Sequence, residues 1–170
     1  MKPRVTDLIA QLDKPALLAW ANRQGLAGID IKKYRQRSKE AGTSLHEKTQ
    51  ARQFIDPLNA ENFARFMSDK EILSQEVKIE TEWFVGRYDC KLQWKGLTYL
   101  VDWKSGNGLY FENKLQLAAY GMAEKTDRAA VVNIPDFILR EANIEQHREK
   151  YEAIIIALSK IYQLRQELGA

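Results

Sequence analysis

The sequence predicts an α/β fold in which a small mixed β-sheet lies between helices. Helical patterns dominate residues 1–70, whereas from residue 72 onward apolar residues alternate with charged ones, as they do in half-buried strands. Three such strands follow one another as a meander, and a helix, a fourth strand and a long helix come after them. This order is typical of helices packed on a small central sheet.

Length and composition indicate one globular domain. The chain has 170 residues, of which 45% are apolar and 29% charged. We expect a single domain over 1–170, with an N-terminal helical part (1–70), a core of sheet and helix (72–135) and a C-terminal helix (145–168). The net charge of +3 is compatible with a nucleic-acid partner, although many other domains share it.

Cysteine content and hydropathy suggest a reducing compartment. Cys90 is the one cysteine, which excludes an internal disulfide and a four-cysteine metal cluster. The N-terminus lacks the apolar run of a signal peptide, and no stretch approaches eighteen apolar residues. We expect a cytoplasmic protein without a membrane span.

Turn and cap residues set the expected element boundaries. Pro15 suits the first position of a helix, Asp30 suits the cap of a basic helix, and Gly42 is expected to end that helix. The expected helices are 6–12, one opening at 15, 31–40, one opening at 43 or 44, 60–67, 112–125 and 145–168. The expected strands are 77–81, 83–94, 97–103 and 129–134, with Lys95-Gly96 as the turn between the second and third.

Two aspartates and a lysine are the strongest chemical signal. Asp89 and Asp102 lie thirteen residues apart on adjoining strands, and Lys104 follows on the same strand face as Asp102. A hairpin of this length can bring both carboxylates to one point, where they can hold a divalent metal and activate a water. The alternatives are a surface-facing acid at Asp89 and an exposed ion pair between Asp102 and Lys104.

Other polar residues can join this group. Gln116 and Tyr120 share one helix face and can reach the sheet edge to contact a phosphate or a base. His46 can ligate a metal, and Glu76 can point into the cleft, although Glu80 and Glu82 compete with it. The alternatives are a packed tyrosine with a polar neighbour and a capping or packed histidine.

Motifs of other enzyme classes are missing. The sequence has no Gly-x-x-x-x-Gly-Lys-Ser/Thr phosphate loop, no His-Glu-x-x-His and no Gly-x-Ser-x-Gly. The basic helix over 31–40 can follow a nucleic-acid backbone or form a solvated face.

The order of these motifs resembles the PD-(D/E)XK nuclease superfamily, and within it the RecB-like exonuclease branch. The resemblance rests on Gly42-Thr43-x-x-His46, Gly86-x-x-Asp89, Asp102-x-Lys104 and Gln116-x-x-x-Tyr120. The segments 5–9 and 14–21 are also similar to compact phage-type and mitochondrial members. The resemblance covers roughly residues 5–125 and implies a restriction-endonuclease-like core.

The resemblance also implies roles. His46, Asp89, Asp102 and the backbone carbonyl of Trp103 would ligate Mg²⁺ or Mn²⁺, and Lys104 would orient the attacking water and steady the developing charge. Glu76 matches the acid on the first strand. The nucleic-acid contacts would come from Gln116, Tyr120, Ser105, Thr43 and Ser44.

We therefore expect a metal-dependent DNA exonuclease that acts on single strands or duplex ends in recombination, repair or replication. Such a protein would act in the cytoplasm of a bacterial or phage-infected cell, and as a minimal nuclease it would work alone, as a homo-oligomer or with a partner protein. The alternatives are a structure-specific or restriction-type endonuclease and a non-catalytic module that binds nucleic acid or a protein partner.

Overall fold

The computed structural model describes residues 2–51, 56–106, 108–134 and 136–169. Within the N-terminal helices it leaves out the side chains of residues 16, 35, 38, 39, 41–43, 45, 46, 48 and 50. The elements, in chain order, are α1 (Val5–Ile9), α2 (Pro15–Leu26), α3 (Ile31–Ala51), α4 (Pro57–Met67), β1 (Lys70–Glu80), β2 (Val85–Trp94), β3 (Leu97–Lys104), α5 (Phe111–Ala123), β4 (Arg128–Asn133), β5 (Ile138–Glu141), the 3₁₀ turn η1 (Glu145–His147) and α6 (Arg148–Glu167).

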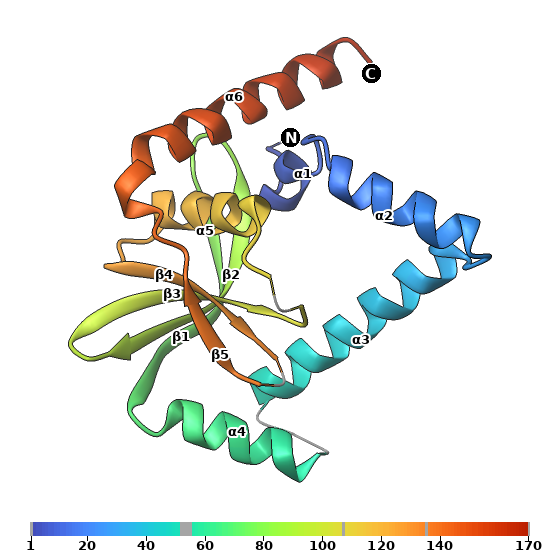
Figure 1. Ribbon diagram of the computed structural model, residues 1–170. Helices are drawn as coiled ribbons and strands as arrows, with labels where there is room; N and C mark the ends of the chain where they lie inside the picture. Colours follow the sequence, from blue (N-terminus) through green and yellow to red (C-terminus); the bar gives the residue numbers. More distant parts are fainter. Residues whose placement is uncertain (1, 52–55, 107, 135, 170) are drawn as a thin grey trace.

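The predicted α/β class is confirmed, with a five-stranded mixed sheet flanked by helices (Figure 1). The strand order is β1-β2-β3-β4-β5, and every neighbouring pair is antiparallel except β3 and β4. Helix α5 makes the crossover that a parallel pair requires. The turn between β2 and β3 is Lys95-Gly96, as predicted, and both residues have positive φ, as a tight hairpin turn needs.

Two apolar cores lie on opposite faces of the sheet. The first, which we call the α5-side core, joins α1, α5 and α6 to the sheet through residues such as Leu8, Leu115 and Ile155. The second, the α4-side core, packs Phe63 and Phe66 of α4 on the other face. Among the described residues, no helix has both the length and the hydrophobicity to cross a membrane.

The expected strand count was wrong, because the sheet has a fifth strand. Strand β5 follows β4 after a short turn in which Phe137 has a φ of +54°. Its four residues carry two charges and none is fully buried, so neither alternation nor hydrophobicity marks it as a strand.

The expected break at Gly42 was also wrong, since α3 runs without interruption for 21 residues. An interior glycine costs a helix only about 1 kcal/mol relative to alanine, which good helix formers on both sides can offset. Helix α1 is likewise shorter than expected and begins one residue earlier, because the Asp7 carboxylate accepts the Arg4 backbone N–H and caps it there.

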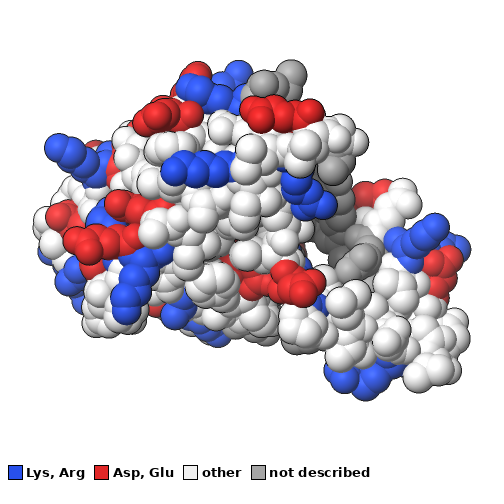
Figure 2. All heavy atoms as spheres, turned by 90° about the horizontal axis from the view of Figure 1, so that it is seen from above, with Lys and Arg blue, Asp and Glu red and all other residues white. Residues whose placement is uncertain are grey.

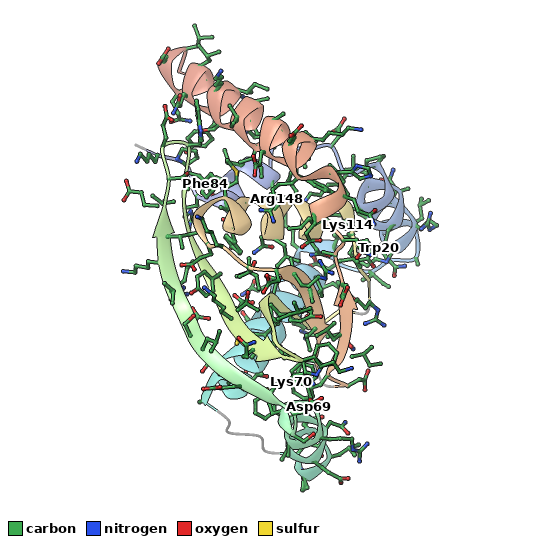
Figure 3. All side chains as sticks on the ribbon, turned by 90° about the vertical axis from the view of Figure 1, so that its left-hand side faces the viewer. Trp20, Asp69, Lys70, Phe84, Lys114 and Arg148 are labelled. Carbon is green, nitrogen blue, oxygen red and sulfur yellow. The ribbon has the colours of Figure 1, made fainter. Side chains whose placement is uncertain are left out.

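The β1–β2 hairpin is long and curved (Figure 3). Its side chains change faces half-way along the hairpin. Tyr88 packs in the α5-side core, whereas Cys90, two residues later, packs in the α4-side core. Regular alternation would place both on one face. The pairs Val77↔Tyr88 and Gln75↔Cys90 flank Glu76 and Asp89, and Glu76 has a φ of +51°. The hairpin therefore switches faces at Glu76 and Asp89.

Gly86 allows α5 to approach the hairpin. A β-carbon at this position would lie 3.0 Å from Cε1 of Tyr120 and 3.2 Å from Cγ2 of Val5. Both neighbours are buried, so neither can move away freely. The close packing of Tyr120 on β2 thus depends on the missing side chain.

We predict that Gly86→Ala lowers the free energy of unfolding by roughly 1–3 kcal/mol, the usual cost of overpacking a core. The measurement is urea unfolding followed by circular dichroism. Gly25→Ala is the matched control, because Gly25 lies in α2 and a β-carbon added there would have nothing within 4 Å. The control should be as stable as the wild type or up to about 1 kcal/mol more stable. Equal stability of Gly86→Ala and the wild type would contradict the prediction.

Candidate functional site

The site lies where the β2–β3 ladder stops. The last pair of this ladder is Cys90↔Val101, and the next residues on the two strands are Asp89 and Asp102. Asp102 is 1% exposed, and Asp89 is half-buried. The backbone N–H of Trp103 donates to Oδ2 of Asp89 over 2.9 Å, so a side chain replaces the lost ladder bond. The hairpin brings the two aspartates together, as the sequence predicted.

A chain of polar contacts leads from Asp102 to α5. Nζ of Lys104 lies 2.7 Å from Oδ2 of Asp102 and donates to Oε1 of Gln116 over 3.3 Å. Nε2 of Gln116 then donates to the Tyr120 hydroxyl over 2.9 Å. The i, i+2 spacing on β3 and the i, i+4 spacing on α5 thus place the four side chains in one connected group. This arrangement excludes the alternative of an exposed ion pair, since Asp102 is buried.

The two carboxylates perturb each other. Burial is the main cause and the nearby charge of Asp102 the second that raise the pKa of Asp89 to about 8. The hydrogen bond from the Trp103 N–H acts in the opposite direction and lowers this pKa. Burial also raises the pKa of Tyr120, so its hydroxyl is neutral at physiological pH. Burial and the charge of Asp89 raise the pKa of Cys90 to about 12, which makes this thiol a poor nucleophile.

The donor set fits a hard divalent cation. Oδ1 of Asp102 is fully buried and has no hydrogen-bond partner among the described residues, while the contact of Oδ2 with Lys104 is an ion pair outside hydrogen-bond geometry. The carbonyl of Lys104 accepts from Ile134 on the β4 side, so the carbonyl of the preceding residue, Trp103, points toward β2 and Asp89. Carboxylate and carbonyl oxygens are the ligands that Mg²⁺ and Mn²⁺ prefer.

Side-chain ligands alone do not make a complete site. Among the described residues, no three His, Cys, Asp or Glu side chains come together closely enough to hold a metal ion. His46 belongs to α3, which contacts β3, but its side chain lies outside the described residues. The prediction that it ligates a metal therefore stays a prediction.

The structure separates the three competing glutamates. Glu76 sits across from Asp89, and its charge contributes to the raised pKa of that residue. Its carboxylate also pairs with Nε of Arg87 over 2.7 Å. Glu80 instead pairs with Lys2 at the surface, and Glu82 is exposed beyond the end of β1. The sequence did not point to the Glu76–Arg87 pair, although Arg87 stands two residues before Asp89.

Within the described part of the chain, the side chains of Ser105 and Ser44 make no hydrogen bond with this group. Ser105 is exposed in the bend after β3, and Ser44 is partly buried within α3. The side chain of Thr43 lies outside the described residues. The exposed lysines of α3, Lys32 and Lys33, are compatible with both a nucleic-acid track and a solvated face.

Comparison with known proteins gives no family assignment. No family model matches the chain, and no curated protein matches it. A solved structure described as "Crystal structure of SSO0001" is similar at 20% sequence identity, with a TM-score of 0.43, over 92% of this chain and 76% of the other. The resemblance to RecB-like nucleases thus rests on the motifs alone.

The raised pKa of Asp89 predicts a stability that depends on pH. The ordinary pKa is 3.8 and the folded one about 8, so between these values the folded state keeps a proton that the unfolded state loses. The free energy of unfolding therefore falls as the pH rises through this window. The free energy of unfolding of Asp89→Asn, measured in urea without divalent metal, should therefore rise steadily relative to that of the wild type from about pH 4 to pH 8.

Asp127→Asn is the control of opposite sign. Hydrogen bonds from Thr98 hold the pKa of Asp127 below its usual value, so its stabilising effect is present above pH 4 and is lost on acidification. This variant should lose stability relative to the wild type as the pH rises to 4 and stay level above it. A constant difference between Asp89→Asn and the wild type across pH 4–8 would contradict the predicted shift.

Proposed function

We propose that this protein is a metal-dependent DNA exonuclease that hydrolyses phosphodiester bonds in single strands or at duplex ends. The observation that carries the proposal is the buried Asp102 beside Asp89, with Lys104 bridging from Asp102 to Gln116 and Tyr120. Burying two carboxylates together is costly unless one of them keeps a proton or a cation binds between them. The proposed setting is DNA processing in the cytoplasm of a bacterial or phage-infected cell.

Asp89, Asp102 and the carbonyl of Trp103 would hold Mg²⁺ or Mn²⁺, with His46 as a further ligand. When bound, the ion lowers the pKa of a water ligand and withdraws charge from the scissile phosphate. Asp102 and Asp89 offer the negative charge that such an ion needs, and the buried Oδ1 of Asp102 has no hydrogen-bond partner among the described residues.

Lys104 has two tasks in this proposal. The side chain of Lys104 is 29% exposed, and contacts of its ammonium group with Asp102 and Gln116 hold it in place. A fixed ammonium group can hold a water by hydrogen bonding and stabilise negative charge that develops on the phosphate. Gln116 and Tyr120 act behind it, since their mutual hydrogen bond fixes the amide that orients Lys104.

Two substitutions test the site. Asp102→Asn and Lys104→Gln should each lower the Mn²⁺-dependent cleavage rate of an end-labelled oligonucleotide by about 100-fold or more. Lys91→Gln is the matched control, because Lys91 is also partly buried and pairs over 3.1 Å with Glu124, the residue that directly follows α5. The control should cleave at the wild-type rate, and all three variants should keep the wild-type circular dichroism spectrum. Full activity of Asp102→Asn would sink the proposal.

A substrate without ends distinguishes an exonuclease from an endonuclease of the same fold. A covalently closed single-stranded circle should survive under conditions in which its linearised form is degraded. Cutting of the circle would replace the exonuclease with an endonuclease. If neither form is cut and calorimetry detects no Mg²⁺ or Mn²⁺ binding in the presence of DNA, the protein is a non-catalytic module.

A further inference from the structure

A pocket of about 600 Å³ lies beside the site on the β1–β2 hairpin. Its floor includes Gly86 and the ring of Tyr120, the residue that ends the polar chain from Asp102. Its charged lining comes from three cations and one acid: Arg4, Lys78, Arg87 and Glu80. The pocket thus shares Tyr120 with the candidate site, and three of its four charged lining residues are basic.

Lys78 and Arg87 stand directly opposite each other on β1 and β2. In such a pair the β-carbons of the two residues lie about 5 Å apart, and like charges on the two side chains destabilise the sheet. Both residues are exposed, so the fold gains no burial from this arrangement. Burial therefore does not account for two facing cations on one hairpin, and an anion bound between them would relieve their repulsion.

The charges around the pocket leave Lys78 uncompensated. Arg4 is held by Asp7 through two hydrogen bonds, Arg87 pairs with Glu76, and Glu80 pairs with Lys2. Within the described part of the chain, the side chain of Lys78 has no hydrogen bond or ion pair. On the face shown in Figure 2, basic and acidic side chains are mixed.

We infer that Lys78 and Arg87 bind a backbone phosphate of the DNA strand, one or two nucleotides from the bond that is cut. This inference rests on the proposed function, which supplies the polyanion. Arg87 and Asp89 are two residues apart on β2, roughly 7 Å along an extended strand. The rise per nucleotide along a duplex axis is about 3.4 Å, and successive phosphates of a strand lie farther apart than this rise, so the distance corresponds to at most about two nucleotides.

The test measures strand binding apart from cleavage. A fluorescein-labelled 12-nucleotide oligo(dT) is titrated with the full chain in EDTA, and binding is followed by anisotropy at several salt concentrations. For one lost phosphate contact on a single strand, the slope of log K against log salt should fall by about 0.7. If the two salt lines meet at 1 M, Lys78→Gln should then bind about eightfold more weakly at 50 mM salt. Lys78→Arg should restore most of the affinity.

Lys95→Gln is the matched control. Lys95 is an exposed lysine at the far end of β2, eight residues or roughly 26 Å from Arg87, and its loss changes the net charge equally. The control should bind like the wild type. In Mn²⁺, Lys78→Gln should raise KM while leaving kcat at saturating substrate near the wild-type value, because Lys78 does not touch the carboxylate group.

Lys78→Glu separates a binding role from a structural one. Glutamate would face Arg87 as an opposite charge, so this variant should unfold at a higher temperature than the wild type and yet bind the oligonucleotide more weakly than Lys78→Gln. If the Lys78 variants bind and cleave like Lys95→Gln, the inference is overturned and the proposed function survives. If the wild type binds oligo(dT) in a Lys78-dependent way but cleaves nothing, the inference stands and the proposed function fails. A wild type that binds no oligonucleotide overturns the inference.

Discussion

The buried contact between Asp102 and Lys104 constrains the structure around it. A carboxylate with 1% exposure in the middle of an apolar strand is unfavourable unless a cation neutralises it. Lys104 supplies that charge from the same strand, but its own position depends on Gln116 of α5. Strand β3 and helix α5 are therefore tied by electrostatics as well as by the packing of the α5-side core.

The approach of α5 in turn depends on the hairpin. Tyr120 lies against Gly86, and its hydroxyl fixes the amide of Gln116. A side chain on β2 at position 86 would push on the tyrosine and, through it, on the amide that holds Lys104. The ring of Tyr120 thus contributes both to the packing of the apolar core and to the orientation of the polar side chains.

Much of this could be predicted from the sequence because the signals are local. Alternation on β3 places Asp102 and Lys104 on one face, the i, i+4 spacing on α5 aligns Gln116 with Tyr120, and Lys95-Gly96 fixes the hairpin register that brings Asp89 to Asp102. What escaped prediction depends on tertiary context. Helix α3 continues through Gly42 because the neighbouring residues need to offset only a small helix-propensity cost. Strand β5 forms at the edge of the sheet because it pairs with β4, and not because of its own sequence pattern. The face switch at Glu76 could not be foreseen, since a glutamate at positive φ carries no signal in the sequence.

Three separate departures from ordinary folding rules meet in this small region. Glu76 adopts a backbone conformation that non-glycine residues avoid, Asp89 and Asp102 share a buried space, and Lys78 faces Arg87 across the hairpin. Each one costs stability, and the described structure offers no packing gain that offsets it at the same place. The departures also differ in charge: the acids lie at the end of the β2–β3 ladder, and the cations lie two or more residues further along the hairpin. A cation between carboxylates and a phosphate between cations would relieve both kinds of repulsion, and a phosphodiester bound through a divalent metal brings these two charges together in one ligand.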